Sequence, residues 1–153
     1  MREIWLASIA AVAIQPFVFA VRLLPALLQS STPIYGLGFL VIAVLVVSAA
    51  FVLILGIPIF LFLRHVHREG WVSLSLAGLL AGAVPIALFS WPKAMPGFSS
   101  GANWHGRYVD LYVQGVPTIY AWQSYAENVA YYGLHGIVGA VVFFTVWRRF
   151  HAP

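Results

Sequence analysis

A run of the chain from Tyr35 to Leu63 contains no Asp, Glu, Lys, Arg or His, and this run restricts the possible fold more than any other feature. It exceeds the ~20 residues that an α-helix needs to cross the ~30 Å hydrocarbon layer of a bilayer. Because lipid cannot hydrogen-bond an open backbone, a transmembrane helix is the expected structure. Since the run is longer than needed, we expect this helix to tilt or to protrude.

Three further apolar runs are also near the length of a membrane span, and the composition agrees with them. The chain is 62% hydrophobic and only 8% charged, whereas a soluble domain is ~45–50% apolar. We therefore predict an all-α integral membrane protein, a single membrane domain over residues 1–153 that folds as a four-transmembrane-helix bundle. The expected helices cover about residues 4–28, 35–63, 71–91 and 126–147, and a long structured extracytoplasmic segment, the cap, covers residues 92–125.

Lys and Arg predict that both termini lie in the cytoplasm, because these residues gather on the cytoplasmic side of membrane helices. In the expected arrangement Lys93 and Arg107 lie on the outer side. Five arginines lie on the inner side: Arg2, Arg64, Arg68, Arg148 and Arg149. The basic residues are scattered at the ends of spans, so the net charge of +4 does not indicate a nucleic-acid partner. We expect the first span to be retained rather than cleaved as a signal peptide, because no A-x-A-like site precedes a polar stretch.

Polar residues recur along the last span and match two polar residues of the first. Glu127, Tyr131 and His135 share one helix face, as do Gln15 and Arg22. Counted from the inner ends of the spans, Gln15 lies about as deep as His135, and Arg22 about as deep as Glu127. We therefore predict an intramembrane polar seam of these five residues, with an Arg22–Glu127 ion pair and a Gln15–His135 contact.

The polar seam has a structural and a functional interpretation. Arg22 could extend alone to the outer headgroups, and Glu127 could mark a helix start, where the helix dipole favours an anion. Ionisable residues inside a membrane also occur in proton and ion pathways. Below His135, however, the last span offers only Gly139 and Thr145 to continue such a pathway. We therefore favour the structural interpretation.

Small residues and prolines mark expected contacts and kinks. Gly78 and Gly82 form a GxxxG pair, and Gly136 and Ala140 repeat this spacing on the last span. Such spacing lets helix backbones approach closely in lipid, and we favour packing within the chain over a dimer interface. Kinks are expected inside the spans at Pro16, Pro58 and Pro85.

The cap is too long and too aromatic for an ordinary loop. Its first part, PKAMPGFSSGANWHG, has the Gly, Pro and Ser of irregular structure. RYVDLYVQG alternates as a short strand would, and Pro117 suits the first turn of a helix that could run into the last span. The candidate partner-binding residues of the cap are Trp104, His105, Arg107, Tyr108, Asp110, Tyr112 and Trp122.

Catalytic and metal chemistry has little support in the sequence. His105, Arg107 and Asp110 could form an external cluster, but they come without a nucleophile pattern or paired carboxylates. His65 and His67 have only Glu69 as a neighbouring carboxylate, which does not make a typical metal site. Because the chain has no Cys, Cys-ligated clusters, thiol oxidases and disulfides are excluded. We predict no catalytic residue, no metal and no cofactor.

Two stretches resemble a known kind of membrane protein. They are GIPIFLFLRHVHREGWVSLSLAGLLAGAVP (Gly56 to Pro85) and YGLHGIVGAVVFFTVWRR (Tyr132 to Arg149). They are similar to small uncharacterised bacterial inner-membrane proteins with a G-x-P-x-F-L-L-x-R turn, a Gly/Ala-rich third helix and a closing Y-G-x-x-G-x-x-G helix that ends in Trp-Arg. The resemblance covers about half of the chain and implies four helices in a bacterial inner membrane, with no assigned activity.

These features predict a non-enzymatic inner-membrane protein that acts by helix packing and partner binding. It would be an accessory subunit or an immunity-type protein, since colicin immunity proteins are similar in size and helix count. The expected partners are the lipid bilayer and either another membrane protein or a second copy of the chain. One alternative is a small proton- or ion-coupled transporter element that uses Arg22, Glu127 and His135. A second alternative is a membrane enzyme with its site in the cap.

Overall fold

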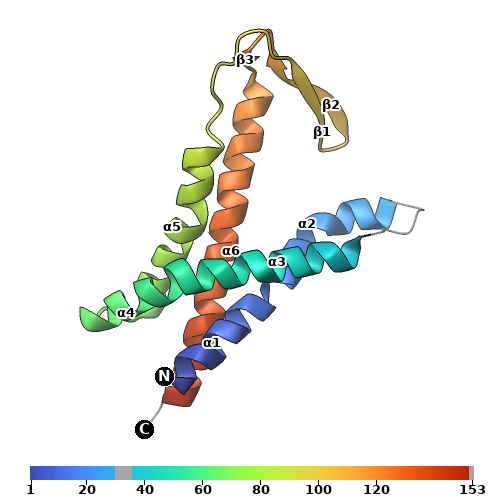
Figure 1. Ribbon diagram of the computed structural model, residues 1–153. Coiled ribbons are helices and arrows are strands. Elements are labelled where there is room, and N and C mark those ends of the chain that lie inside the picture. Colours follow the sequence, from blue (N-terminus) through green and yellow to red (C-terminus); the bar gives the residue numbers. More distant parts are fainter. Residues whose placement is uncertain (30–35, 152–153) are drawn as a thin grey trace.

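The computed structural model describes residues 1–29 and 36–151, which are mostly helical. Figure 1 shows the helices and strands in their order along the chain. They are α1 (Arg2–Ala13), α2 (Gln15–Gln29), α3 (Leu37–Phe51), the π-helical segment η1 (Val52–Gly56), α4 (Ile57–His65), α5 (Trp71–Phe89), β1 (Ser100–Trp104), β2 (Arg107–Val113), β3 (Val116–Pro117) and α6 (Ile119–His151).

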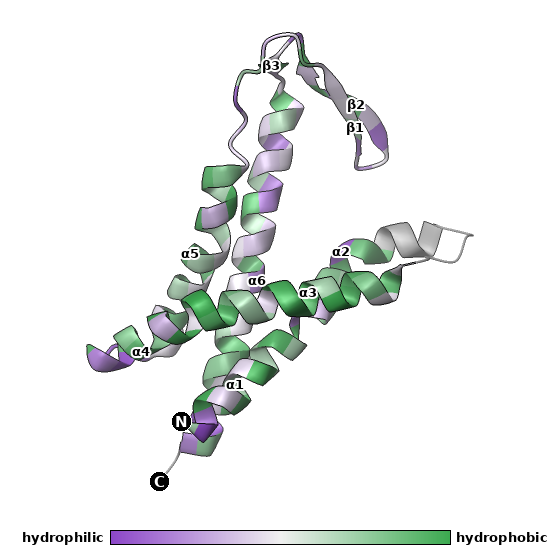
Figure 2. Cartoon of the chain, in the orientation of Figure 1, coloured by the Kyte–Doolittle hydropathy of each residue, from purple (hydrophilic) through white to green (hydrophobic). Residues whose placement is uncertain are grey.

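Four helical stretches among the described residues are long and apolar enough to cross a membrane. They are Arg2–Leu24, Leu37–His65, Trp71–Phe89 and Ile119–His151. Figure 2 shows that α3 is apolar along its length, whereas the part of α6 nearest the sheet carries polar residues. The prediction of four apolar helices of spanning length is confirmed.

Helices α5 and α6 lie side by side and run in opposite directions (Figure 1). Glycines let their backbones touch, because a methyl group at Gly78 would collide with the carbonyl oxygen of Gly136. A methyl group at Gly82 would likewise collide with the carbonyl oxygen of Tyr132. Ala140 also faces Gly78, so the small residues expected to mediate helix packing meet one another within the chain.

The buried core lies where α1 packs against the C-terminal part of α6. Ala7 and Ala11 of α1 have almost no exposed surface, because their small side chains allow a close approach between helices. The ring of Phe60 from α4 contacts the rings of Phe143 and Trp147, with centroids 4.9 and 5.0 Å away. Helix α1 begins and α6 ends at this same end of the molecule (Figure 1).

The first apolar stretch is divided at Ile14 into α1 and α2. Pro16 lacks the N–H that would bond the carbonyl four residues earlier, so the regular helix ladder is interrupted there. The N–H of Phe17 donates instead to the carbonyl oxygen of Ile14, at 3.1 Å. The kink expected at Pro16 corresponds to this break between α1 and α2. Pro85 lies inside α5, which continues to Phe89.

Helix α3, η1 and α4 form one continuous rod, named here the α3–α4 rod. Its π-helical segment ends just before Pro58, whose missing N–H frees a carbonyl in the preceding turn and favours a wider turn. The rod crosses α5 and α6 instead of running beside them (Figure 1). No residue of its most apolar 18-residue window is buried. The chain is therefore helical as predicted, but this rod packs across its neighbours.

The cap, all of which the structure describes, contains a three-stranded antiparallel sheet in the order β1-β2-β3. The fold is therefore not purely α-helical. The strand expected in RYVDLYV is confirmed as β2, but β1 lies in the stretch that was expected to be irregular. Two-residue turns join the strands, and positive φ angles at His105, Gly106, Gln114 and Gly115 are those of type I′ hairpins.

Helix α6 begins at Ile119, earlier than the start expected near residue 126. Pro117 ends β3, and the hydroxyl of Thr118 donates to the carbonyl oxygen of Asp110 at 2.6 Å. The helix therefore starts directly from the sheet. Its first turns stand beyond the end of α5 and carry the hairpin of β1 and β2 back toward α2 (Figure 1).

Candidate functional site

The predicted contact between Gln15 and His135 is confirmed. The side-chain oxygen Oε1 of Gln15 lies 2.5 Å from Nδ1 of His135. Gln15 is only 7% exposed, so this contact joins the start of α2 to the middle of α6 in a mostly apolar setting. Gly139 makes room for it, because a methyl group there would lie 2.9 Å from Nε2 of Gln15.

The surrounding bonds define the direction of this contact. Nε2 of Gln15 donates to the carbonyl oxygens of Ala11, at 3.2 Å, and of His135, at 3.3 Å. Both amide hydrogens are thereby used, so Oε1 is the acceptor and Nδ1 of His135 is the donor. This assignment of the imidazole tautomer follows from the hydrogen-bond pattern. The pair is a fixed structural link between two helices.

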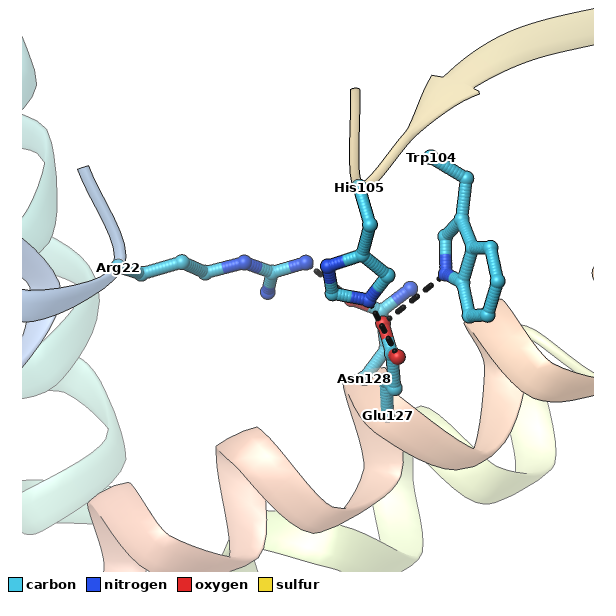
Figure 3. Close-up of polar contacts among 5 residues, drawn as sticks. All are labelled: Arg22, Trp104, His105, Glu127 and Asn128. Carbon is cyan, nitrogen blue, oxygen red and sulfur yellow. Dashed lines mark hydrogen bonds and ion pairs between the residues drawn. The ribbon is translucent and has the colours of Figure 1, made fainter. Parts of the chain in front are cut away.

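Arg22 does not form the predicted ion pair with Glu127. Its Nη2 donates to Oδ1 of Asn128 at 2.9 Å (Figure 3). Its guanidinium carbon also lies 4.6 Å from the centroid of the Tyr131 ring, a cation–π contact. The reason is helix geometry, because Asn128 and Tyr131 are three residues apart and share the face of α6 that meets α2.

Glu127 is bound by the cap. Nε1 of Trp104 donates to its Oε2 at 3.2 Å, and Nε2 of His105 lies 2.8 Å from its Oε1 (Figure 3). Trp104 and His105 lie at the tip of the β1–β2 hairpin, where the tight turn brings both rings to one side of α6. The hairpin tip is thus held to the helix by one carboxylate that is itself partly exposed, with 43% of the side chain accessible.

Adjacent positions on α6 therefore serve two different elements. Successive residues of a helix point about 100° apart, so Glu127 faces the hairpin while Asn128 faces α2. The α6 side chains that face α2 are Asn128, Tyr131 and His135, which are spaced three and four residues apart. That spacing is present in the sequence, but the four-residue series through Glu127, Tyr131 and His135 is the more regular pattern there. The drift of ~40° in every four-residue step turns such a series away from its neighbour.

Arg22 and Glu127 nevertheless line one small surface hollow of about 270 Å³, together with Val21 and Tyr131. The hollow lies between α2 and α6. Its lining is mostly apolar, and both charged side chains are bonded to other residues, Arg22 to Asn128 and Glu127 to the hairpin tip.

The other candidate residues of the cap do not converge. Arg107 and Asp110 are three residues apart on β2, so their side chains leave opposite faces of the strand. Tyr108 is 77% exposed, and the ring of Tyr112 contacts Phe98. The ring of Trp122 contacts Trp91 and Tyr125 at the end of α5. The external cluster of His105, Arg107 and Asp110 is therefore not assembled.

No group of three or more His, Asp or Glu that could hold a metal ion occurs among the described residues. A larger cavity, of about 490 Å³, separates the α3–α4 rod from the α5–α6 pair. Its lining is mostly apolar, with the bonded pair of Gln15 and His135 on one side. The inner pair leaves Nε2 of His135 buried without a hydrogen-bond partner among the described residues, whereas the outer hollow is open to the surface.

No protein-family model, curated protein or solved structure matches the chain. The resemblance to small four-helix bacterial inner-membrane proteins therefore stays a prediction. Function is inferred from the geometry of the chain's own residues.

Proposed function

We propose that the chain is a multi-pass protein of a bacterial inner membrane, with both termini in the cytoplasm, that acts without catalysis by binding a partner. The partner is a transmembrane helix of another membrane protein or of a second copy. The binding surface is the outer face of the α3–α4 rod, defined by Phe39, Ile42, Val46 and Leu53. The observation that carries this proposal is the near absence of burial along that rod.

The outer face of the rod is a continuous apolar stripe. Phe39, Ile42 and Val46 are 75%, 61% and 63% exposed, and Leu53 is 49% exposed. Their spacing of three, four and seven residues places them on one side of the helix. The opposite side, which includes Val44 and Phe51, lines the large cavity within the chain. A partner could therefore contact the stripe without entering the cavity.

The crossing of the rod supports a partner rather than lipid alone. Helices in a bilayer associate by close side-chain packing, because lipid provides no hydrophobic force that drives them together. The α5–α6 pair has such packing at its glycines, whereas the rod lies across this pair. A helix from outside the chain would give the rod the lateral packing that its own chain leaves open.

The bonds along the polar seam support a structural role there. His135 is linked to Gln15, Arg22 to Asn128, and Glu127 to the cap. A proton relay would need these groups to exchange protons with one another. Glu127 and His135 instead have different partners, on different elements, so the seam joins α2, α6 and the hairpin.

The test uses the absence of Cys, because a single introduced cysteine is then the only thiol in the chain. A thiol-linked photo-crosslinker would be placed at Val46→Cys on the outer face, with Val44→Cys on the cavity side as the matched control. We expect irradiation of native membranes to give one discrete protein adduct from position 46 and little from position 44. Replacing Phe39 by Ala should weaken that adduct.

The mass of the adduct distinguishes a second copy from another protein. Lipid adducts alone at both positions would contradict the proposal. Equal protein adducts from Val46→Cys and Val44→Cys would also contradict it, because the outer face would then have no special role.

A further inference from the structure

The cavity between the α3–α4 rod and the α5–α6 pair has the size and the lining of a small-molecule site. Its volume of about 490 Å³ lies within the ~300–1,000 Å³ that is typical of ligand pockets. Among the described residues that line it, none is Asp, Glu, Lys or Arg, and most are aliphatic or aromatic. A charged molecule would lose its hydration there without gaining a charged partner, so the lining favours an uncharged, mostly hydrocarbon occupant.

One wall of this cavity contains a hydrogen-bond acceptor without a partner. His135 lines the cavity, and its Nδ1 donates to Oε1 of Gln15. A neutral imidazole carries only one N–H, so Nε2 is an acceptor. This nitrogen is buried and has no hydrogen-bond partner among the described residues, which costs free energy in an apolar setting. A group that completes the site must therefore be a donor, such as a hydroxyl.

The acceptor is covered, so an occupant must displace a side chain to reach it. Tyr132 is placed for such a movement, because it lines the cavity and its ring centroid lies 6.2 Å from that of the His135 imidazole. Tyr132 is also 42% exposed, so its ring can turn outward without entering the core. The imidazole itself is held by Gln15, whose amide is fixed by two backbone carbonyls.

The cavity is open toward the surroundings of the helices. Val47 of the rod lines it and is nevertheless 61% exposed. On the facing wall, Ala77 and Ala81 of α5 are four residues apart and both line the cavity. Their small side chains leave room along one face of the helix, where a narrow chain fits better than a bulky ring.

We propose that this cavity binds an uncharged membrane lipid with a single hydrocarbon chain and a terminal hydroxyl, a long-chain alcohol. The hydroxyl donates to Nε2 of His135, and the chain lies between the rod and the small residues of α5. This site rests on the proposed insertion of the chain in a membrane. It does not depend on the partner proposed for the outer face of the rod, because the cavity lies on the opposite side.

The experiment uses the full chain in phosphatidylcholine vesicles and three photoactivatable probes. The probes share one saturated chain with a diazirine at its middle and end in a hydroxyl, a methyl ether or a carboxylate. We expect the hydroxyl probe to label the cavity walls roughly fivefold more than the ether, the ratio expected for one net hydrogen bond. The carboxylate should label least, since the lining offers its charge no partner. Peptide mass spectrometry locates the adducts.

Two substitutions test the cavity and the acceptor separately. Ala81→Phe fills the cavity from α5 and should reduce labelling by the hydroxyl probe about tenfold. Leu80→Phe is the matched control, because Leu80 is 58% exposed and does not line the cavity, and it should leave labelling unchanged. His135→Leu removes the acceptor, so the hydroxyl and ether probes should then label equally. This ratio is measured within one variant, so partial misfolding does not imitate it.

Three results would overturn the site. They are equal labelling of the unchanged protein by the hydroxyl and ether probes, a hydroxyl preference that survives His135→Leu, and full labelling of Ala81→Phe. If a chain that resists alkaline carbonate extraction gives any of these results, the lipid site alone is wrong. Release of the chain by carbonate would instead overturn the membrane insertion on which the proposed function also rests.

Discussion

At the scale of single residues, Gln15 and Arg22 are two polar side chains on one apolar segment that differ in burial and in bonding partner. Gln15 is buried and bonded to His135, and its amide hydrogens are satisfied by two backbone carbonyls. Arg22 is exposed and rests on Tyr131. The first side chain contributes to the core, whereas the second lies on the surface.

The buried link should have a measurable effect on stability. Gln15→Leu removes the acceptor of the Nδ1 hydrogen of His135 and leaves that donor unsatisfied, so we expect a loss of about 1–3 kcal/mol. Equilibrium unfolding in mixed detergent micelles would measure it, with Gln123→Leu at an exposed position of α6 as the control. Adding His135→Leu should recover part of the loss, because the orphaned donor is then gone. Equal effects at positions 15 and 123 would contradict the link.

The partner of Arg22 can be tested by double-mutant cycles. We expect the coupling of Arg22→Gln with Asn128→Ala to exceed its coupling with Glu127→Gln, because Asn128 accepts a hydrogen bond from the guanidinium and Glu127 does not. The value should be about 1 kcal/mol or less, since the contact is exposed. Exchange of the charges, Arg22→Glu with Glu127→Arg, should not restore stability. Such a restoration would support the ion pair that the sequence first suggested.

At the scale of elements, the glycines of α5 and α6 determine how closely these helices approach. Gly78→Ala would place a methyl group against the carbonyl oxygen of Gly136, and we expect it to cost about 1–3 kcal/mol through overpacking. Gly38→Ala is the matched control, because a methyl group at that helical glycine meets no atom within 4 Å. This control should gain up to about 1 kcal/mol from helix propensity. Unfolding measurements that give both changes the same sign would contradict the contact.

At the scale of the whole molecule, the proposed orientation places the turn after α4 and the cap on opposite sides of the membrane. Single cysteines at Val66 and Tyr108, both exposed, report on the two sides. A membrane-impermeant maleimide should label Tyr108→Cys in intact spheroplasts and Val66→Cys only after lysis. The reverse pattern would invert the topology. Labelling of both in intact cells would contradict insertion as proposed.

Much of this architecture was readable from the sequence, for a physical reason. In lipid, an apolar run such as residues 35–63 satisfies its backbone hydrogen bonds as a helix, so the helices follow from local composition. The equal depths of Gln15 and His135 also predicted their contact correctly, because a buried polar side chain needs a hydrogen-bond partner and has few within reach. Proline inside a helix removes one hydrogen bond of the ladder, so the break near Pro16 could be expected without tertiary information.

Tertiary structure alone decided which neighbour each remaining polar group received. Arg22 and Glu127 are exposed, and a long side chain at the surface has several partners within reach, so matching depths could not select one. The hairpin that binds Glu127 depends on the pairing of β1 with β2 around a tight turn with positive φ angles at His105 and Gly106, and its place beside α6 depends on the sheet from which the helix starts. The crossing of the α3–α4 rod likewise depends on side-chain packing between helices, which hydropathy does not encode. The sequence by itself thus determined the helices and the buried link, and the assembled fold determined the outer hollow.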